Sequence, residues 1–153
     1  QTRDRCCLEY GEKEMALEAK VRIRVLSIQW LGRHMEELAP EKAALVPADG
    51  WILSPRQVTF QEGESVFQVL QRVCRENKIH MESSFTPLYN SAYIEGIGNL
   101  YEFDAGSLSG WMYTVNDWFP NYGCSRYQLR SGDVLHWVYT CDLGKDVGGG
   151  MTN

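Results

Sequence analysis

The sequence is poor in the residues that mark most catalytic and metal-binding proteins. Its 153 residues include only three histidines and five cysteines, and no two cysteines have the CxxC spacing typical of zinc ligands. We therefore predict no metal site. Asp and Glu outnumber Lys and Arg by 20 to 15, which gives a net charge of -5 without a basic stripe. A nucleic-acid partner, whose phosphates need neutralising, is not expected.

Long apolar runs are also missing. No segment approaches the roughly 20 apolar residues that cross a bilayer. No signal-peptide pattern occurs at Gln1, so an exported protein with this sequence is expected to have lost its leader. The chain is 44% hydrophobic, which is enough for one domain with a buried core.

The odd number of cysteines leaves at least one thiol unpaired within a monomer. The sequence agrees equally well with two alternatives. Either a disulfide joins two of Cys74, Cys124 and Cys141, or these cysteines are buried free thiols. The polar residues 1–18 are interpreted as an N-terminal extension, the domain is predicted over 19–145, and the glycine-rich residues 146–153 are predicted to be a flexible tail.

Period-two alternation of apolar and polar residues predicts a series of short strands. The expected strands are 21–26, 57–61, 80–85, 92–95, 100–103, 111–116 and 135–140. Pro47, Asp49-Gly50 and Pro55 are typical of a loop, so residues 47–55 are interpreted as one. Residues 32–47 carry a weak apolar stripe, broken by Pro40, that fits either a helix or irregular structure.

One segment has a strong helical pattern. Over residues 65–77 the apolar positions recur at i, i+3, i+4 and i+7 and form one broad face, opposite a polar face. Such a helix must cover a sheet. The order of elements predicts an α+β fold in which a mostly antiparallel sheet packs on this one principal helix.

Most of the aromatic residues lie between Gly106 and Thr140. Four of them alternate within the two predicted strands of this region and are expected in the core: Trp111, Tyr113, Trp137 and Tyr139. The loop from Asn116 to Gly123 is different, because it holds three large rings among turn residues. These rings, Trp118, Phe119 and Tyr122, either fold back on the domain or form a platform for a flat ligand or a partner, bordered by Asn116, Asp117 and Asn121.

Enzyme motifs find little support. The segment Gly106 to Gly110 has no serine at the middle position of a nucleophile elbow, and Gly96-Ile97-Gly98 lacks the third glycine of a dinucleotide loop. A catalytic cysteine paired with His136 stays a minor alternative, because the two residues of such a pair can be far apart in the sequence and close together in the fold. We expect no enzymatic activity.

Several short motifs carry a family pattern: Gly110-Trp111-Met112-Tyr113, Val115-Asn116, Tyr127, Leu129, Gly132-Asp133 and Tyr139-Thr140. Together they resemble the pattern of domain of unknown function 4430, the transcobalamin C-terminal-like family. The resemblance covers about residues 20–145. The family includes standalone bacterial members, many from Firmicutes, which look like this chain. It implies a β-grasp-like fold and an extracytoplasmic setting, either secreted or attached to the cell surface. In the vitamin B12 carriers of this kind, the small C-terminal domain closes over one face of the corrinoid.

The combined expectation is a non-enzymatic small-ligand-binding module that requires no cofactor and takes cobalamin or another corrinoid. The alternative is a protein-interaction or adhesion module of a bacterial cell-surface assembly, with a surface protein as the partner. The expected ligand-binding residues in the loop are Asn116, Trp118, Phe119, Asn121 and Tyr122. The resemblance adds Trp111 and Tyr113, which match the aromatic strand that lies near the ligand in the carriers.

Overall fold

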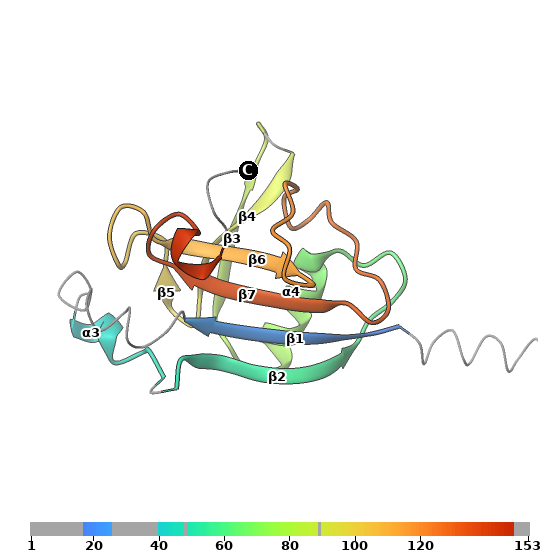
Figure 1. The fold of residues 1–153 in the computed structure, drawn as a ribbon, viewed down its shortest axis with the longest axis horizontal. Coiled ribbons are helices and arrows are strands. Elements are labelled where there is room, and N and C mark those ends of the chain that lie inside the picture. Colours follow the sequence, from blue (N-terminus) through green and yellow to red (C-terminus); the bar gives the residue numbers. More distant parts are fainter. Residues whose placement is uncertain (1–16, 26–39, 48, 89, 149–153) are drawn as a thin grey trace, which may run out of the picture.

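Four strands form the larger of two sheets, in the order β2-β1-β7-β6 (Figure 1). The computed structural model describes residues 17–25, 40–47, 49–88 and 90–148. The two central strands, β1 and β7, run parallel, and each outer strand pairs antiparallel with its neighbour. The strands are β1 (Glu18–Val25), β2 (Trp51–Thr59), β6 (Gly110–Val115) and β7 (Val134–Thr140).

The interpretation of residues 47–55 as a loop is wrong from Trp51 onward, because β2 runs through Pro55. Val21 pairs with Arg56 and Ile23 pairs with Leu53, so two residues of β2 oppose one residue of β1. This is a bulge in an edge strand, where a proline without an N–H group removes no hydrogen bond from the sheet. Because Pro55 was assigned to a loop, the strand predicted at 57–61 begins six residues later than β2 does.

The predicted helix is confirmed as α4 (Val66–Glu76), which lies behind the larger sheet in Figure 1. Ser65 is its N-cap: the Ser65 hydroxyl accepts from the backbone N–H of Gln68, and the Gln68 side chain accepts from the backbone N–H of Ser65. Such capping boxes satisfy two N–H groups that a helix start otherwise leaves unpaired. The buried side chains are those of the predicted apolar face: Val66, Val69, Leu70, Val73 and Cys74.

A smaller antiparallel sheet has the order β3-β4-β5. It is formed by β3 (Met81–Thr86), β4 (Ser91–Ile97) and β5 (Leu100–Tyr101). The tight turn between β4 and β5 is Gly98-Asn99, and both residues have positive φ, 63° and 66°. Glycine and asparagine are the residues that tolerate this conformation in two-residue hairpins. The strands expected at 92–95 and 100–103 are therefore confirmed as β4 and β5, although β5 is shorter than expected.

Side chains from both sheets and α4 form one hydrophobic core. Trp137 and Tyr139 are its largest fully buried residues, and Trp111 and Tyr113 are buried beside them, as predicted. The α+β fold with a mostly antiparallel sheet is confirmed, whereas the β-grasp likeness stays a prediction.

The other helices in the described ranges are short. In the weakly patterned segment, α3 (Pro40–Ala43) begins at a proline, and the 3-10 helix η2 (Lys145–Val147) follows β7. Within the described ranges, no helix has both the length and the apolar character needed to cross a membrane. The predicted extension is described only at residues 17 and 18, and the predicted tail only at residues 146–148; the part of the weak stripe before residue 40 also lies outside the described residues.

Two of the three cysteines considered for a disulfide are buried free thiols, Cys74 and Cys124. With both of them free, none of the pairings among Cys74, Cys124 and Cys141 is formed, which favours the alternative of free thiols. Burial raises the pKa of each of the two thiols from 9.0 to about 12, so both stay protonated at neutral pH. They therefore pack as small apolar side chains.

Candidate functional site

A tight turn at Asn116 and Asp117 starts the loop that runs from Asn116 to Tyr127, which we call the aromatic loop. Both residues have positive φ, 55° and 66°, which Asn and Asp tolerate better than other non-glycine residues. On either side of the turn, Val115 and Trp118 exchange two backbone hydrogen bonds of 2.9 and 3.0 Å. The local sequence thus forms a two-residue hairpin turn that fixes where Trp118 leaves the sheet.

The side-chain amide of Asn116 is used within the fold. Its Oδ1 accepts from the backbone N–H of Val134 at 2.9 Å, and its Nδ2 donates to Asp133 Oδ1 at 3.0 Å. These bonds tie the turn to the start of β7. Of the expected ligand-binding residues, Asn116 therefore has a clear structural role.

A series of ring contacts leads from the core to the surface. The Tyr113 ring lies 5.3 Å from the Trp137 ring and 6.3 Å from the Tyr127 ring, measured between centroids. Tyr127 in turn lies 6.4 Å from Trp118 and 6.3 Å from Tyr122. The outer two rings are open to solvent, with 52% of Trp118 and 58% of Tyr122 exposed. We call Trp118, Tyr122 and the half-buried Tyr127 the aromatic surface.

The loop that carries the aromatic surface is held at several points. The Tyr113 hydroxyl donates to the backbone carbonyl of Tyr122 at 2.6 Å. Burial raises the pKa of Tyr113, so this donor keeps its proton. The first two N–H groups of α4 donate to the carbonyls of Cys124 and Tyr127, at 2.9 and 2.8 Å. The loop thereby satisfies N–H groups that a helix start leaves unpaired.

Trp111 lies away from this surface, at the other end of β6. Its indole N–H donates to the carbonyl of Leu100 at 2.8 Å, and its ring meets Tyr139 edge to face at 5.2 Å. The Tyr139 hydroxyl is bonded in turn to Ser109 Oγ and to the carbonyl of Tyr101. Trp111 is therefore a core residue that joins the two sheets.

Two cavities open on either side of Tyr122. The first, of about 470 Å³, lies between the aromatic loop and the turn from β3 to β4, and Asn121, Leu88 and Tyr93 line it together with Tyr122. The second, of about 600 Å³, lies on the side of Asn116 and Tyr127. The first cavity places Asn121 beside the aromatic surface.

Sequence reasoning missed Arg126 and Tyr127 as site residues. The exposed Arg126 lines both cavities, and among the described residues its guanidinium has no hydrogen-bond or ion-pair partner. Nothing in the sequence distinguishes Arg126 from other surface arginines. Tyr127 belongs to the family pattern, and that pattern is the signal by which it could have been found.

Phe119 lies over the outer face of the larger sheet, which is the face turned away from α4. There it lines a separate cavity with Arg22 and His136. The seven expected ligand-binding residues therefore occupy three places: the core, the aromatic surface with its cavities, and the outer face of the larger sheet.

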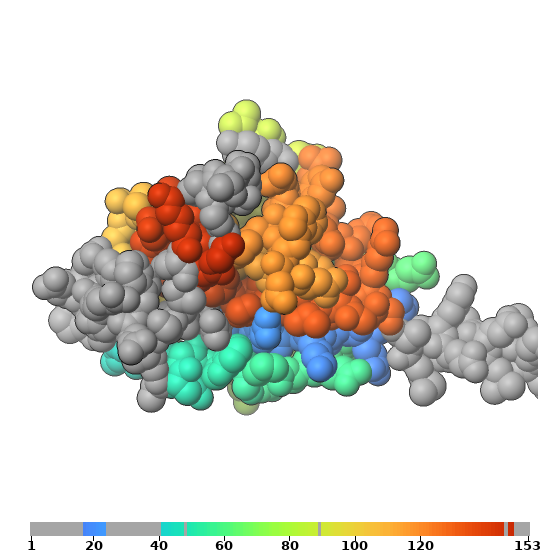
Figure 2. Space-filling view, in the orientation of Figure 1, coloured from blue at the N-terminus to red at the C-terminus, as the bar shows by residue number. Residues whose placement is uncertain are grey.

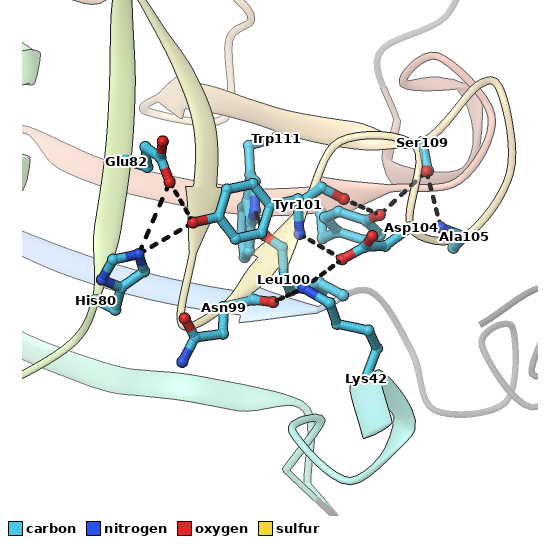
Figure 3. A network of polar contacts seen from close by, with 11 residues as sticks. Lys42, His80, Glu82, Asn99, Leu100, Tyr101, Asp104, Ala105, Ser109 and Trp111 are labelled. Carbon is cyan, nitrogen blue, oxygen red and sulfur yellow. Dashed lines mark hydrogen bonds and ion pairs between the residues drawn. The ribbon is translucent and has the colours of Figure 1, made fainter. Parts of the chain in front are cut away.

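A polar cluster joins the smaller sheet to α3 (Figure 3). The Tyr101 ring lies flat against Gly96, where an added Cβ would come within 2.8 Å of the ring. The Tyr101 hydroxyl donates to Glu82 and lies 3.0 Å from His80 Nε2, while Lys42 Nζ lies 4.7 Å from the ring centroid. The bond to Glu82 raises the pKa of Tyr101 to about 12, so the phenol is protonated at neutral pH. We assign this cluster to the fold.

The described part of the chain contains no group of three or more His, Cys, Asp or Glu side chains that could hold a metal ion.

The solved structures that resemble this chain at low sequence identity include the following two. One is a candidate metal-binding protein from Ruminococcus gnavus, which is 13% identical with a TM-score of 0.45, over 80% of this chain and 95% of that one. The other is haptocorrin in complex with Cbi, which is 14% identical with a TM-score of 0.52, over 84% of this chain. The match covers 26% of haptocorrin, so this chain corresponds to about a quarter of that protein.

No curated protein matches the sequence. The family model described as domain of unknown function (DUF4430) matches residues 63–141, a range that runs from the start of α4 through the whole of β7 and holds the complete aromatic loop. The chain belongs to the DUF4430 family.

Proposed function

We propose that this chain is a non-enzymatic, extracytoplasmic module that binds a flat small ligand, cobalamin or another corrinoid, on the aromatic surface. One observation carries the proposal: Trp118 and Tyr122 expose more than half of their area although the loop beneath them is fixed by hydrogen bonds to the core and to α4. Exposed rings on a fixed support bind a flat ligand with little loss of conformational entropy. The fold shared with haptocorrin, whose structure holds Cbi, supports the choice of ligand class.

The cavities beside Tyr122 fit this ligand class. A corrin is a flat ring system with amide side chains, so it needs rings for stacking and amide or guanidinium groups at the edge. Asn121 and Arg126 supply such groups at the rim of the aromatic surface. The cavity next to Asn121 thus combines apolar side chains, such as Leu88 and Tyr93, with polar groups that can orient a ligand.

Titration of the protein with cobinamide and with cobalamin tests the proposal, with isothermal calorimetry as the readout and Trp fluorescence as the second. We expect saturable heat and quenching that are lost when Trp118→Ala and Tyr122→Ala are combined. Phe103→Asn is the matched control, because it removes a ring that is 62% exposed at φ 71°, a conformation that Asn tolerates. Absence of heat at high micromolar ligand, or an equal loss in the control, would refute the corrinoid assignment.

The second candidate is a protein-interaction or adhesion module of a bacterial cell-surface assembly. It is favoured by the turn from β3 to β4, where Leu88 is 82% exposed beside the cavity next to Tyr122. An exposed apolar side chain next to exposed rings is typical of a protein-docking surface. A pulldown from cell-surface extract that is lost in Leu88→Ser and in Trp118→Ala, while corrinoid titrations stay silent, would favour this function over the first.

A further inference from the structure

Three residues form a row across the outer face of the larger sheet, the face opposite α4. Arg22 in β1 pairs with His136 in β7, and His136 pairs with Thr114 in β6. Their neighbours along the strands, such as Val21 and Tyr113, are buried in the core, so side chains alternate between the two faces. The row therefore lies on the side of the sheet that faces the viewer in Figure 1, near η2.

A cavity of about 370 Å³ opens over this row. Figure 2 shows the same face, with the orange segment that follows β6 above the blue of β1. The turn after β6 and the end of η2 border the cavity. The remaining lining residues are Asp117, Phe119, Val138, Val147 and Gly148. The cavity thus combines the apolar side chains of Phe119, Val138 and Val147 with the polar row and Asp117.

Two polar atoms of the floor are buried without a hydrogen-bond partner in the described structure. Thr114 is only 5% exposed, and its hydroxyl lacks a partner, as does Nε of Arg22. A buried donor without a partner is unfavourable, because it has lost its hydrogen bond to water and gained none in exchange. Two such groups beside one cavity indicate a missing hydrogen-bond acceptor.

The guanidinium of Arg22 has unused hydrogen-bonding capacity toward the described residues. Its Nε and Nη2 form one edge, the edge that binds carboxylates and phosphates through two parallel hydrogen bonds. Among the described residues, Nη2 has only a long contact, 3.4 Å, to Asp117 Oδ1, while Nε has no hydrogen-bond partner. The Asp117 side chain is 87% exposed, so it can turn into solvent at little cost. A stronger acceptor can therefore take its place.

We propose that this cavity binds a small oxyanion, a carboxylate or phosphate group, on the Nε and Nη2 edge of Arg22, with the Thr114 hydroxyl donating to the same group. The oxyanion replaces the Asp117 carboxylate, and the body of an organic acid packs against Phe119 and Val138. This site is independent of the corrinoid proposal, because it lies on another face and shares none of the residues of the aromatic surface.

Calorimetric and NMR titrations of the full chain with inorganic phosphate and, separately, with benzoate test the site. We expect saturable binding of at least one probe, and the preferred probe identifies the phosphate or the carboxylate as the natural group. Loss of a charge-assisted hydrogen bond weakens binding by about 10- to 100-fold. Arg22→Gln should show this loss, whereas Arg75→Gln, the same charge change at an exposed position of α4, should leave the affinity unchanged.

Two further variants make the prediction sharper. Asp117→Asn removes the competing carboxylate and should tighten anion binding, whereas a cation site would be weakened by the same change. Thr114→Val keeps the shape but removes the unpaired hydroxyl. It should unfold at the same or a higher temperature than the wild type without ligand, and bind the probe about 10-fold more weakly.

Four outcomes would overturn the proposal. They are the absence of saturable binding of both probes at tens of millimolar, equal losses in Arg22→Gln and Arg75→Gln, weaker binding in Asp117→Asn, and a clearly lower unfolding temperature of Thr114→Val. The last result would mean that the hydroxyl is already bonded inside the protein.

Discussion

Substitution of Gly123 by alanine should destabilise the protein through a single steric conflict. A Cβ at this position would lie 1.8 Å from Ser91 Oγ and 2.4 Å from Ser91 Cβ. Gly123 is not among the residues with positive φ, so alanine suits its backbone and the conflict is purely one of space. Ser91 is buried at the start of β4, and its hydroxyl is bonded to Ser125 Oγ at 3.0 Å. The side chain cannot move away without losing that bond.

The expected cost follows from the distances. Forcing an extra methyl group into a packed site destabilises proteins by about 1–3 kcal/mol. Loss of glycine's freedom in the unfolded chain offsets about 0.4–1 kcal/mol of this. For a chain of this length, 1 kcal/mol corresponds to about 2–4 °C in Tm. Thermal unfolding followed by circular dichroism should therefore show a Tm lower by several degrees.

Two variants check that the conflict with Ser91 is the cause. Gly110→Ala is the control, because the nearest atom to its Cβ would be Glu102 Cβ at 3.6 Å, an ordinary contact; its Tm should stay near that of the wild type. In the double variant Gly123→Ala with Ser91→Gly, both conflicting atoms are gone. The double variant should be more stable than the sum of the single changes, with a coupling of about 1 kcal/mol or more. Strictly additive effects would refute the steric explanation.

The remaining predictions concern the helix cap, the loop anchor and the buried thiols. Ser65→Ala should lower the free energy of unfolding in urea by about 1 kcal/mol, because the start of α4 loses its cap; an unchanged midpoint would contradict this. Tyr113→Phe removes the donor to the Tyr122 carbonyl and should lower stability by about 1 kcal/mol while speeding hydrogen exchange in the aromatic loop. The pKa of Cys74 and of Cys124 is raised from 9.0 to about 12, so the unfolded thiols ionise first and stability falls as pH rises from 9 toward 12, by up to about 1.4 kcal/mol per pH unit for each thiol. Unfolding midpoints across this pH range check the slope, which should be smaller in Cys124→Ala.

Periodicity was sufficient to predict most of the fold. The apolar stripe of α4 and the alternation in β6 and β7 identified these elements within a residue or two, because their buried faces leave no other arrangement of the apolar side chains. The same reasoning failed at β2, where Pro55 was interpreted as a strand breaker. Whether a strand lies at an edge depends on the order of strands in the sheet, and that order is set by contacts distant in sequence.

The site was only partly predictable, for a related reason. A loop sequence shows which residues are aromatic but not where each ring points. Trp118 and Phe119 are neighbours in sequence, yet one belongs to the aromatic surface and the other to the cavity over Arg22. Arg126 gives no signal at all until the fold brings it to the rim beside Tyr122.

The two proposed sites start from the same hairpin, and this makes their independence testable. The turn at Asn116 and Asp117 sends Trp118 toward Tyr127 on one side of the sheet, while Asp117 reaches Arg22 on the other. Asp117→Asn changes the charge over Arg22 but leaves the turn intact, since Asn also tolerates positive φ. Corrinoid binding should therefore be unaffected in this variant while anion affinity rises. If both affinities change together, the turn itself moves when either ligand binds, and the two sites are coupled through it.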